Sequence, residues 1–205
     1  MRLLHQILKS TSRERGFTSI ELLITVTLLG VLLAIGLPSF QSLIASSRLT
    51  TATNDLLASL AQTRSEAVRL GNRVSICKSA NGTQCVTTGD WEQGWIIFAD
   101  SNRTTPDANN AFVNTGENIS FLAQALPGGI VVKGNATVSQ YVSFSADGQS
   151  KSLNGAFQAG TIRVCSTSGA LSDDKRARDL VINSVGRIAL EKPASVSPGC
   201  PAPAS

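Results

Sequence analysis

Four cysteines are the side chains with the clearest chemistry in this sequence: Cys77, Cys85, Cys165 and Cys200. All four follow a long apolar segment, so translocation of the chain would place them in an oxidising compartment, where an even number predicts disulfide bonds. Three pairings are open, and we favour Cys77 with Cys85 and Cys165 with Cys200. The dipeptide Asn81-Gly82 is a turn signal that lets the first pair meet. Buried free thiols are the alternative, and zinc is disfavoured because no CxxC spacing or histidine accompanies the cysteines.

The only histidine, His5, lies in a basic stretch, residues 1–16, which we expect to be removed as a leader peptide. Without it the chain cannot form a Ser-His-Asp or Cys-His nucleophile or a histidine-ligated metal centre, so we expect no enzyme, cofactor or metal. Four of the 18 basic residues and one of the 14 acidic residues lie in the same stretch, which leaves 14 against 13. Such a balance gives no bulk attraction to nucleic acid.

Glu21 is the only charged residue in an apolar run, residues 17–37. A helix of that length crosses a hydrocarbon core of roughly 30 Å, so the run predicts a transmembrane helix. Arg13 and Arg15 precede it and predict that the N-terminal end is cytoplasmic. A carboxylate in such a segment costs about 2 to 3 kcal/mol, so it needs a partner. Alternatively, Glu21 reaches the interface from the first helical turn, where the helix dipole favours an acid.

The candidate cleavage site, Arg15-Gly16-Phe17, precedes the apolar run, whereas an ordinary secretory signal is cut after its apolar stretch. The apolar helix would therefore remain in the mature protein. Residues 16–23, Gly-Phe-Thr-Ser-Ile-Glu-Leu-Leu, resemble the type IV prepilin signature, with Ser19 in place of the usual leucine. The resemblance implies cleavage after Gly16 by prepilin peptidase and N-methylation of the new Phe17 amine.

That amine, on a neighbouring subunit, is the expected partner of Glu21 in a bundle of such helices. The pair would favour the correct stagger during assembly, because any other register leaves a buried charge unpaired.

Residues 38–71 follow a helical period and predict an amphipathic helix that ends near Gly71. Pro38 lacks an amide donor and should kink or locally unwind the junction with the preceding segment. We expect one apolar stripe to pack on the rest of the chain; its members are Leu49, Ala52, Leu56, Leu57, Leu60, Ala61, Ala67 and Val68.

Residues 72–205 change to a strand pattern with turn residues between short β-branched and aromatic runs. The predicted strands are 74–77, 95–99, 130–133, 141–144, 161–165, 180–182 and 187–190. Short strands of this kind predict antiparallel sheets packed on the helix, an α+β fold. The proline-rich tail after Lys192 should be irregular, with Cys200 attaching it to the sheet.

Two segments of this part resemble the GspH/FimT family of minor pilins and pseudopilins. They are residues 90–100, Asp-Trp-Glu-Gln-Gly-Trp-Ile-Ile-Phe-Ala-Asp, and residues 183–187, Asn-Ser-Val-Gly-Arg. The resemblance implies a type IV pilin-like ladle, in which a long N-terminal helix packs on antiparallel β-sheets. It also implies a place at the tip of a type IV pilus or of a type II secretion pseudopilus.

Gly186-Arg187 raises the question of DNA, because some FimT-like proteins bind it through a Gly-Arg-x-Arg motif. Ala189 stands where the second arginine would be, which leaves Arg187 and Lys192 as candidate contacts. A nearby basic cluster, Arg163, Lys175, Arg176 and Arg178, is diluted by Asp173, Asp174 and Asp179. Affinity for DNA grows with the number of neutralised phosphates, so this sequence disfavours DNA binding.

Two other features have ordinary interpretations. Residues 100–117 offer oxygen ligands for calcium, but Thr105 stands where the loop would need glycine and Arg103 intrudes, which favours a polar loop. Trp91 and Trp95 are expected to pack in the core or at a subunit contact.

The sequence thus predicts a minor pilin that joins other minor and major pilins through its N-terminal helix. The alternatives are a minor pseudopilin of a type II secretion system and a DNA-binding competence pilus component. The expected location is the bacterial inner membrane, in a single pass with the globular part in the periplasm, and then a pilus or pseudopilus tip.

Overall fold

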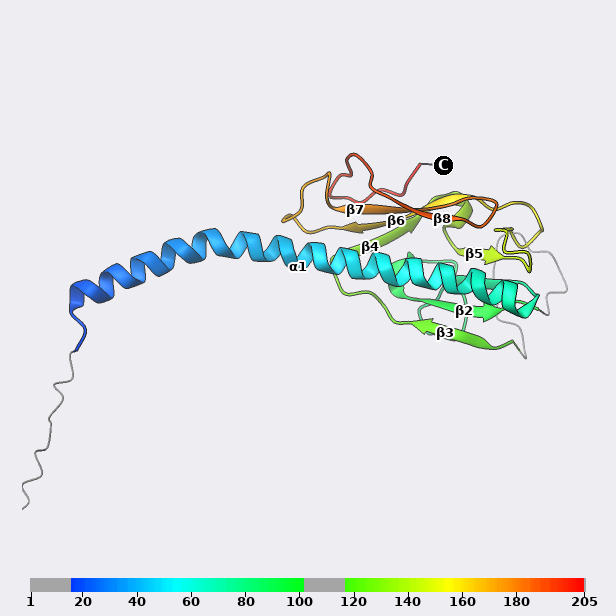
Figure 1. The fold of residues 1–205 in the computed structure, drawn as a ribbon, viewed down its shortest axis with the longest axis horizontal. Helices are drawn as coiled ribbons and strands as arrows, with labels where there is room; N and C mark the ends of the chain where they lie inside the picture. The colour runs from blue at the N-terminus through cyan, green and yellow to red at the C-terminus, as the bar shows by residue number, and fades with distance from the viewer. Residues whose placement is uncertain (1–15, 102–116, 205) are drawn as a thin grey trace, which may run out of the picture. The chain divides into compact units, whose positions relative to one another are not determined.

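The computed structural model describes residues 16–101 and 117–204, apart from the side chain of Pro38. It has one long helix, eight strands and two short 3-10 helices in the described ranges (Figure 1). The helix α1 spans Ser19–Leu70; η1 spans Trp91–Gln93 and η2 spans Ala136–Val138. The strands are β1 Val74–Lys78, β2 Trp95–Ala99, β3 Ile119–Ala123, β4 Ile130–Gly134, β5 Tyr141–Phe144, β6 Gly160–Ser166, β7 Ala177–Ile182 and β8 Ile188–Glu191. The chain divides into two units, of which the first ends at Phe40 and the second, which we call the body, begins at Gln41.

The helix α1 is continuous between its two ends. It passes Pro38 without a break in helical structure, so the local unwinding predicted there is absent. It ends at Leu70, and Gly71 follows with φ of +64°. Glycine adopts this left-handed conformation without steric cost, which explains why the helix stops where the sequence predicted.

Two four-stranded antiparallel sheets form the rest of the body, with strand orders β3-β2-β1-β5 and β4-β6-β7-β8. Typical cross-strand neighbours are Ile76 with Ile97 in the first sheet and Ile162 with Leu180 in the second. The predicted α+β fold with antiparallel sheets is confirmed. All seven predicted strands form, two of them with the expected limits and the others within three residues of theirs, and β3 was not predicted.

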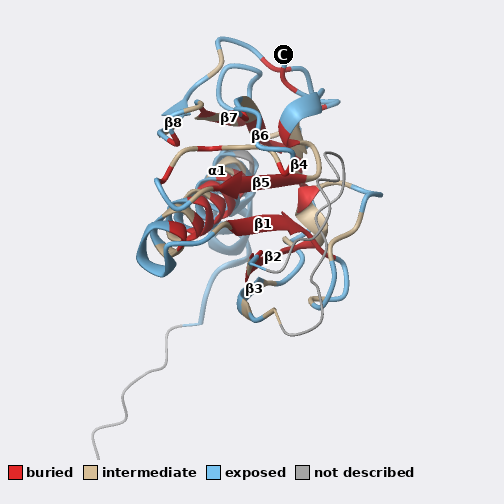
Figure 2. Cartoon of the chain, turned by 90° about the vertical axis from the view of Figure 1, so that its right-hand side faces the viewer, coloured by how far each residue is buried: buried red, intermediate tan, exposed pale blue. Residues whose placement is uncertain are grey.

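One core joins the helix to both sheets. Leu49, Ala52, Leu56, Leu60 and Ala67 of α1 are buried in the same cluster as inward side chains of both sheets. Figure 2 shows buried residues along α1 beside the buried strands β1 and β5. By the area rule, burying an apolar side chain of leucine size stabilises the fold by about 1.5 to 3 kcal/mol.

The predicted stripe was wrong at two positions, since Ala61 and Val68 are exposed. The polar residues Thr53, Ser59 and Thr63 are buried instead. Each of their hydroxyls donates to the backbone carbonyl four residues earlier, at 2.7 to 2.8 Å. Such bonds satisfy the hydroxyl within the helix itself, so these residues can face the core.

Both tryptophans lie in the core. The indole nitrogen of Trp91 donates to the Val138 carbonyl at 3.1 Å, and that of Trp95 donates to the Ser59 hydroxyl at 2.9 Å. A buried indole usually finds such a partner, and these two bonds connect η1 and β2 to other elements of the body. Of the two predicted roles, packing in the core is the one observed.

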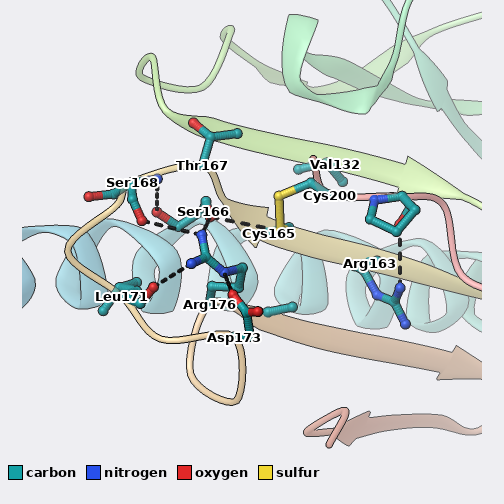
Figure 3. The surroundings of a disulfide bond; sticks show 12 residues. Val132, Arg163, Cys165, Ser166, Thr167, Ser168, Leu171, Asp173, Arg176 and Cys200 are labelled. Carbon is teal, nitrogen blue, oxygen red and sulfur yellow. Dashed lines mark hydrogen bonds and ion pairs between the residues drawn. A yellow bond between two sulfur atoms is a disulfide. The ribbon is translucent and has the colours of Figure 1, made fainter. Parts of the chain in front are cut away.

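Two disulfides join the pairs that the sequence favoured, Cys77 with Cys85 and Cys165 with Cys200. Each lies in a small apolar cluster of its own, separate from the main core. In the first loop, the side-chain oxygen of Asn81 accepts from the amides of Thr83 and Gln84, which forms the predicted turn. The second bond attaches the C-terminal tail to β6, as expected (Figure 3).

Candidate assembly site

The first unit contains an apolar helical surface that no other described residue covers. Residues 17–37 are exposed throughout, including Leu32 at 68% and Ile35 at 72%. By length and composition this part of α1 is able to cross a membrane. Every backbone group in a helix interior bonds within the helix, which is what a hydrocarbon environment requires.

The hydroxyls of two threonines in this surface are hydrogen-bonded within the helix. The hydroxyl of Thr25 donates to the Leu22 carbonyl, and that of Thr27 to the Ile24 carbonyl, both at 2.8 Å. With these hydroxyls bonded inside the helix, Glu21 is the one charged group on the surface.

Thr18 positions Glu21 at the start of the helix. The Glu21 amide donates to the Thr18 hydroxyl at 3.3 Å, and the Leu22 amide donates to the Thr18 carbonyl at 3.1 Å. Thr18 is therefore the N-cap, which we did not predict, although the spacing Thr-x-x-Glu is a known signal for it. No described residue forms a hydrogen bond or ion pair with the Glu21 carboxylate, so it is open to a partner from outside the chain.

The predicted processing site lies at the edge of the described residues. Phe17 is 81% exposed, and a side chain at Gly16 would meet no atom within 4 Å. The predicted leader that precedes them, with His5, Arg13 and Arg15, lies outside the described residues. Cleavage after Gly16 and methylation of Phe17 stay predictions.

The Gly186-Arg187 segment forms the turn between β7 and β8. The side-chain oxygen of Asn183 accepts from the Arg187 amide at 2.8 Å, and Gly186 has φ of +77°. A side chain at Gly186 would lie 2.0 Å from the Gly148 carbonyl oxygen, so only glycine fits. Its role here is close backbone packing.

Arg64 of α1 connects this turn to a second one. Its Nε donates to the Gly148 carbonyl at 2.9 Å and its Nη2 donates to the Val185 carbonyl at 3.3 Å. We did not predict this role. In the sequence, Arg64 stands out only as an arginine at the edge of the apolar stripe. That position does not identify partners more than eighty residues away.

Two arginines of the basic cluster considered for DNA binding, Arg163 and Arg176, are bonded within the chain. Arg163 forms a bidentate pair with Asp179 at 2.8 Å, and this bond raises the pKa of the arginine. Arg176 is buried and donates to the carbonyls of Ser166, Ser168 and Leu171 and to Asp173 (Figure 3). Neither guanidinium is free for phosphate. Arg187 and Lys192, the two candidate DNA contacts, are exposed.

Lys78 is a buried base beside the first disulfide. Burial lowers its pKa, partly offset by Asp90 and Glu92, and its Nζ donates to the Gly89 carbonyl at 2.6 Å. It holds the loop that follows Cys85 in place. In the ranges 16–101 and 117–204, no three histidine, cysteine or acidic residues are grouped as metal ligands. The candidate calcium loop lies largely outside these ranges.

A model of the family described as "Type II transport protein GspH" matches residues 52–186. The chain belongs to this family. The match covers most of the body of this GspH-family protein, from α1 to the Gly186 turn. It includes residues 90–100 and, apart from Arg187, residues 183–187, the two segments that carry the resemblance in the sequence.

Two relatives of the GspH-family chain carry the names of a fimbrial protein and of a type IV pilin. It is 36% identical over 72 residues to fimbrial protein Q of Moraxella bovis, across 35% of this chain and 45% of that one. It is 42% identical over 45 residues to a type IV major alpha-pilin of the same species, across 22% and 28%. The chain thus spans less than half the length of the curated relatives it matches.

A solved structure supports the fold. The chain resembles the crystal structure of the type IV minor pilin FimU of Pseudomonas aeruginosa, with a TM-score of 0.50 and 23% identity, over 73% of this chain and 95% of that one. This likeness confirms the pilin-like arrangement of a long N-terminal helix with antiparallel sheets.

Proposed function

We propose that this GspH-family chain is a minor pilin that assembles through its N-terminal helix into the priming or tip complex of a type IV pilus. The observation that carries the proposal is the exposed apolar segment of α1, in which Glu21 is the one charge and has no partner in the described chain. A globular protein rarely exposes so large an apolar surface unless a membrane or another subunit covers it.

The chemistry of assembly follows from this surface. Before assembly, the segment anchors the protein in the inner membrane as a single helix, with the body in the periplasm. Prepilin peptidase would cut after Gly16 and release the Phe17 amine for methylation. In a bundle of pilin helices, the Glu21 carboxylate of one subunit would then pair with the Phe17 amine of its neighbour. Subunits in another register would leave the acid unpaired in an apolar environment, which is strongly unfavourable.

The partners are therefore other minor and major pilins. The names of the curated relatives, a fimbrial protein and a type IV major pilin, support a pilus as the assembly to which this chain belongs. The family description supports the alternative, a minor pseudopilin of a type II secretion system, which would use the same helix and the same acid.

The two machines are distinguished by deleting the gene and restoring it in trans with an epitope tag. A minor pilin predicts loss of surface pili, normal release of type II secretion substrates, and tagged chain in the sheared filament fraction. Loss of secretion with normal piliation would instead identify the chain as a minor pseudopilin of a type II secretion system. Normal piliation and secretion, with no tagged chain in sheared filaments, would contradict both.

Processing has its own test. Replacing Gly16 by a bulky residue, Gly16→Leu, should leave an uncut precursor in the membrane fraction, because the peptidase is expected to require a small residue before the cut. Mass spectrometry of the purified chain would show the leader still attached. A normal mature mass from this variant would contradict the prepilin interpretation.

A further inference from the structure

The body has a groove near the Leu70 end of α1. It lies between this helix and the two turns that Arg64 connects, one at Gly148 and one at Gly186. Its volume is about 570 Å³. The apolar part of its lining includes Ala61, Val68 and Ile188, and the side chain of Val68 is 55% exposed. Ala61 and Val68 are helix positions that the sequence analysis placed in the core, and both are exposed, so burial in the fold does not explain their apolar character.

Three arginines line the same groove: Arg64, Arg69 and Arg187. Arg64 is already bonded to the Gly148 and Val185 carbonyls. The guanidiniums of Arg69 and Arg187 form no hydrogen bond or ion pair with any other residue that the structure describes. Two cationic groups are thus available beside an apolar floor.

The single acid in the lining, Asp147, is already neutralised. Its carboxylate accepts from the Ser145 hydroxyl, the Gln149 amide and the Lys151 ammonium, the last two at 3.1 Å. These bonds, chiefly the one from Ser145, lower the pKa of Asp147 to about 2. The acid keeps its own partners, and the groove as a whole is positive.

The groove is also preformed. Arg64 fixes both turns, and Gly186 packs against the Gly148 carbonyl so closely that no side chain fits at position 186. A site whose walls are already held in place loses little conformational entropy when it binds a ligand.

We infer that this groove receives an acidic segment of a neighbouring pilin-type subunit, one that places an apolar side chain beside a carboxylate. The inference rests on the proposed function, which supplies such neighbours. Charge complementarity selects the occupant: the carboxylate contacts Arg69 and Arg187 while the apolar side chain covers Val68 and Ile188. Arginine suits this role because its planar fork matches a carboxylate.

DNA is the competing occupant, and the lining argues against it. Affinity for DNA grows with the number of neutralised phosphates, and only two cations here are free. The phosphates of a duplex backbone offer no apolar group to cover Val68. A protein segment uses both the charges and the apolar floor.

The binding test uses the full chain in detergent micelles and a fluorescent peptide of alternating leucine and glutamate. We expect saturable binding that falls roughly tenfold with Arg69→Glu or with Arg187→Glu, the effect of losing one charge-assisted bond. Arg187→Lys should keep most of the affinity. Lys175→Glu, which removes an exposed base outside the groove, should leave the affinity unchanged.

Three results of the binding test would overturn the inference. They are no binding of the acidic peptide, equal binding of a matched peptide with glutamine in place of glutamate, and displacement of the acidic peptide by a short DNA duplex. The last would assign the groove to nucleic acid.

A cross-linking test in cells separates this inference from the proposed function. A benzophenone amino acid at position 68 should cross-link a pilin-type subunit, and the captured peptide should contain an aspartate or glutamate. Arg69→Glu and Arg187→Glu together should abolish the cross-link. If the chain enters filaments but position 68 captures an acid-free peptide or nothing, the groove inference fails while the proposed function stands. If the chain is absent from filaments, the proposed function fails and the peptide titration still decides whether the groove binds acidic segments.

Discussion

The two parts of α1 share one helical backbone but use apolar side chains differently. Residues 19–37 are apolar on all sides and exposed. Residues 41–70 carry one buried stripe, which enters a core that both sheets share. A helix that is apolar all round needs a partner on every side, whereas an amphipathic helix needs one only along its stripe. The first part is therefore adapted to contacts outside the chain, and the second to contacts within it.

The acids of the two parts differ in the same way. In the body, Glu66 accepts from the Gln62 amide at 2.8 Å and from the Ser120 hydroxyl at 2.7 Å. Glu21 has no such bond in the described chain, although Thr18 caps the helix beside it. The contrast indicates that Glu66 contributes to the fold, and it supports the proposal that Glu21 serves assembly.

Removing a disulfide should have the largest effect, and only on the body. Cys165 and Cys200 close a loop of 35 residues, and chain entropy predicts that replacing both by serine lowers the free energy of unfolding by about 4 kcal/mol. Replacing Cys77 and Cys85, which close a loop of eight residues, should lower it by about 2.5 kcal/mol. Both tryptophans lie in the body, so their fluorescence during urea unfolding in micelles reports this stability alone. Equal losses from the two bonds would contradict the loop-length argument.

A matched pair of leucines in α1 tests the comparison directly. Leu56→Ala should lower the free energy of unfolding of the body by about 3 kcal/mol, because Leu56 is fully buried and leaves a cavity. Leu32→Ala, at an exposed position of the first part, should change it by less than about 0.5 kcal/mol. The same fluorescence measurement serves both. Similar losses from the two variants would show that the two parts are not independent.

The contacts of Arg64 should contribute less. Arg64→Met removes its bonds to the Gly148 and Val185 carbonyls, with an expected cost of about 1 to 2 kcal/mol. Arg48→Met is the control, because Arg48 is an exposed arginine of the same helix that forms no such bond with any residue the structure describes. Hydrogen exchange at the amides of Gly148 and Gly186 should accelerate in Arg64→Met and not in Arg48→Met. Unchanged exchange in Arg64→Met would contradict the role of Arg64 in fixing the turns.

Local patterns in the sequence were enough for most of the fold. Strand periodicity, the glycine after Leu70 and the turn at Asn81-Gly82 predicted the elements and both disulfides. The polar residues on the buried side of α1 were not predictable from hydrophobicity, because Thr53 and Thr63 become compatible with the core only through bonds to their own helix. Strand order depends on contacts between distant segments, which periodicity does not encode.

The missed strand and the missed arginine have one physical cause. The strand β3 lies at a sheet edge with exposed Phe121 and Leu122, and its pairing shifts register next to Phe98. Its residues lack the inside-outside alternation that identifies a half-buried strand. Arg64 likewise acts through partners far away in the chain. In both cases the structural role depends on residues that are close in space but distant in the sequence, and the local sequence does not predict those neighbours.

The central claim is that Glu21 serves assembly and leaves folding unaffected. The most direct test compares wild type, Glu21→Gln and Glu21→Asp in sheared filaments, with the membrane content of each chain and the urea midpoint of its tryptophan fluorescence measured in parallel. We predict that Glu21→Gln is made, inserted and folded normally but is lost from the filament fraction, while Glu21→Asp retains a measurable share. Wild-type incorporation of Glu21→Gln, at equal membrane content, would contradict the account.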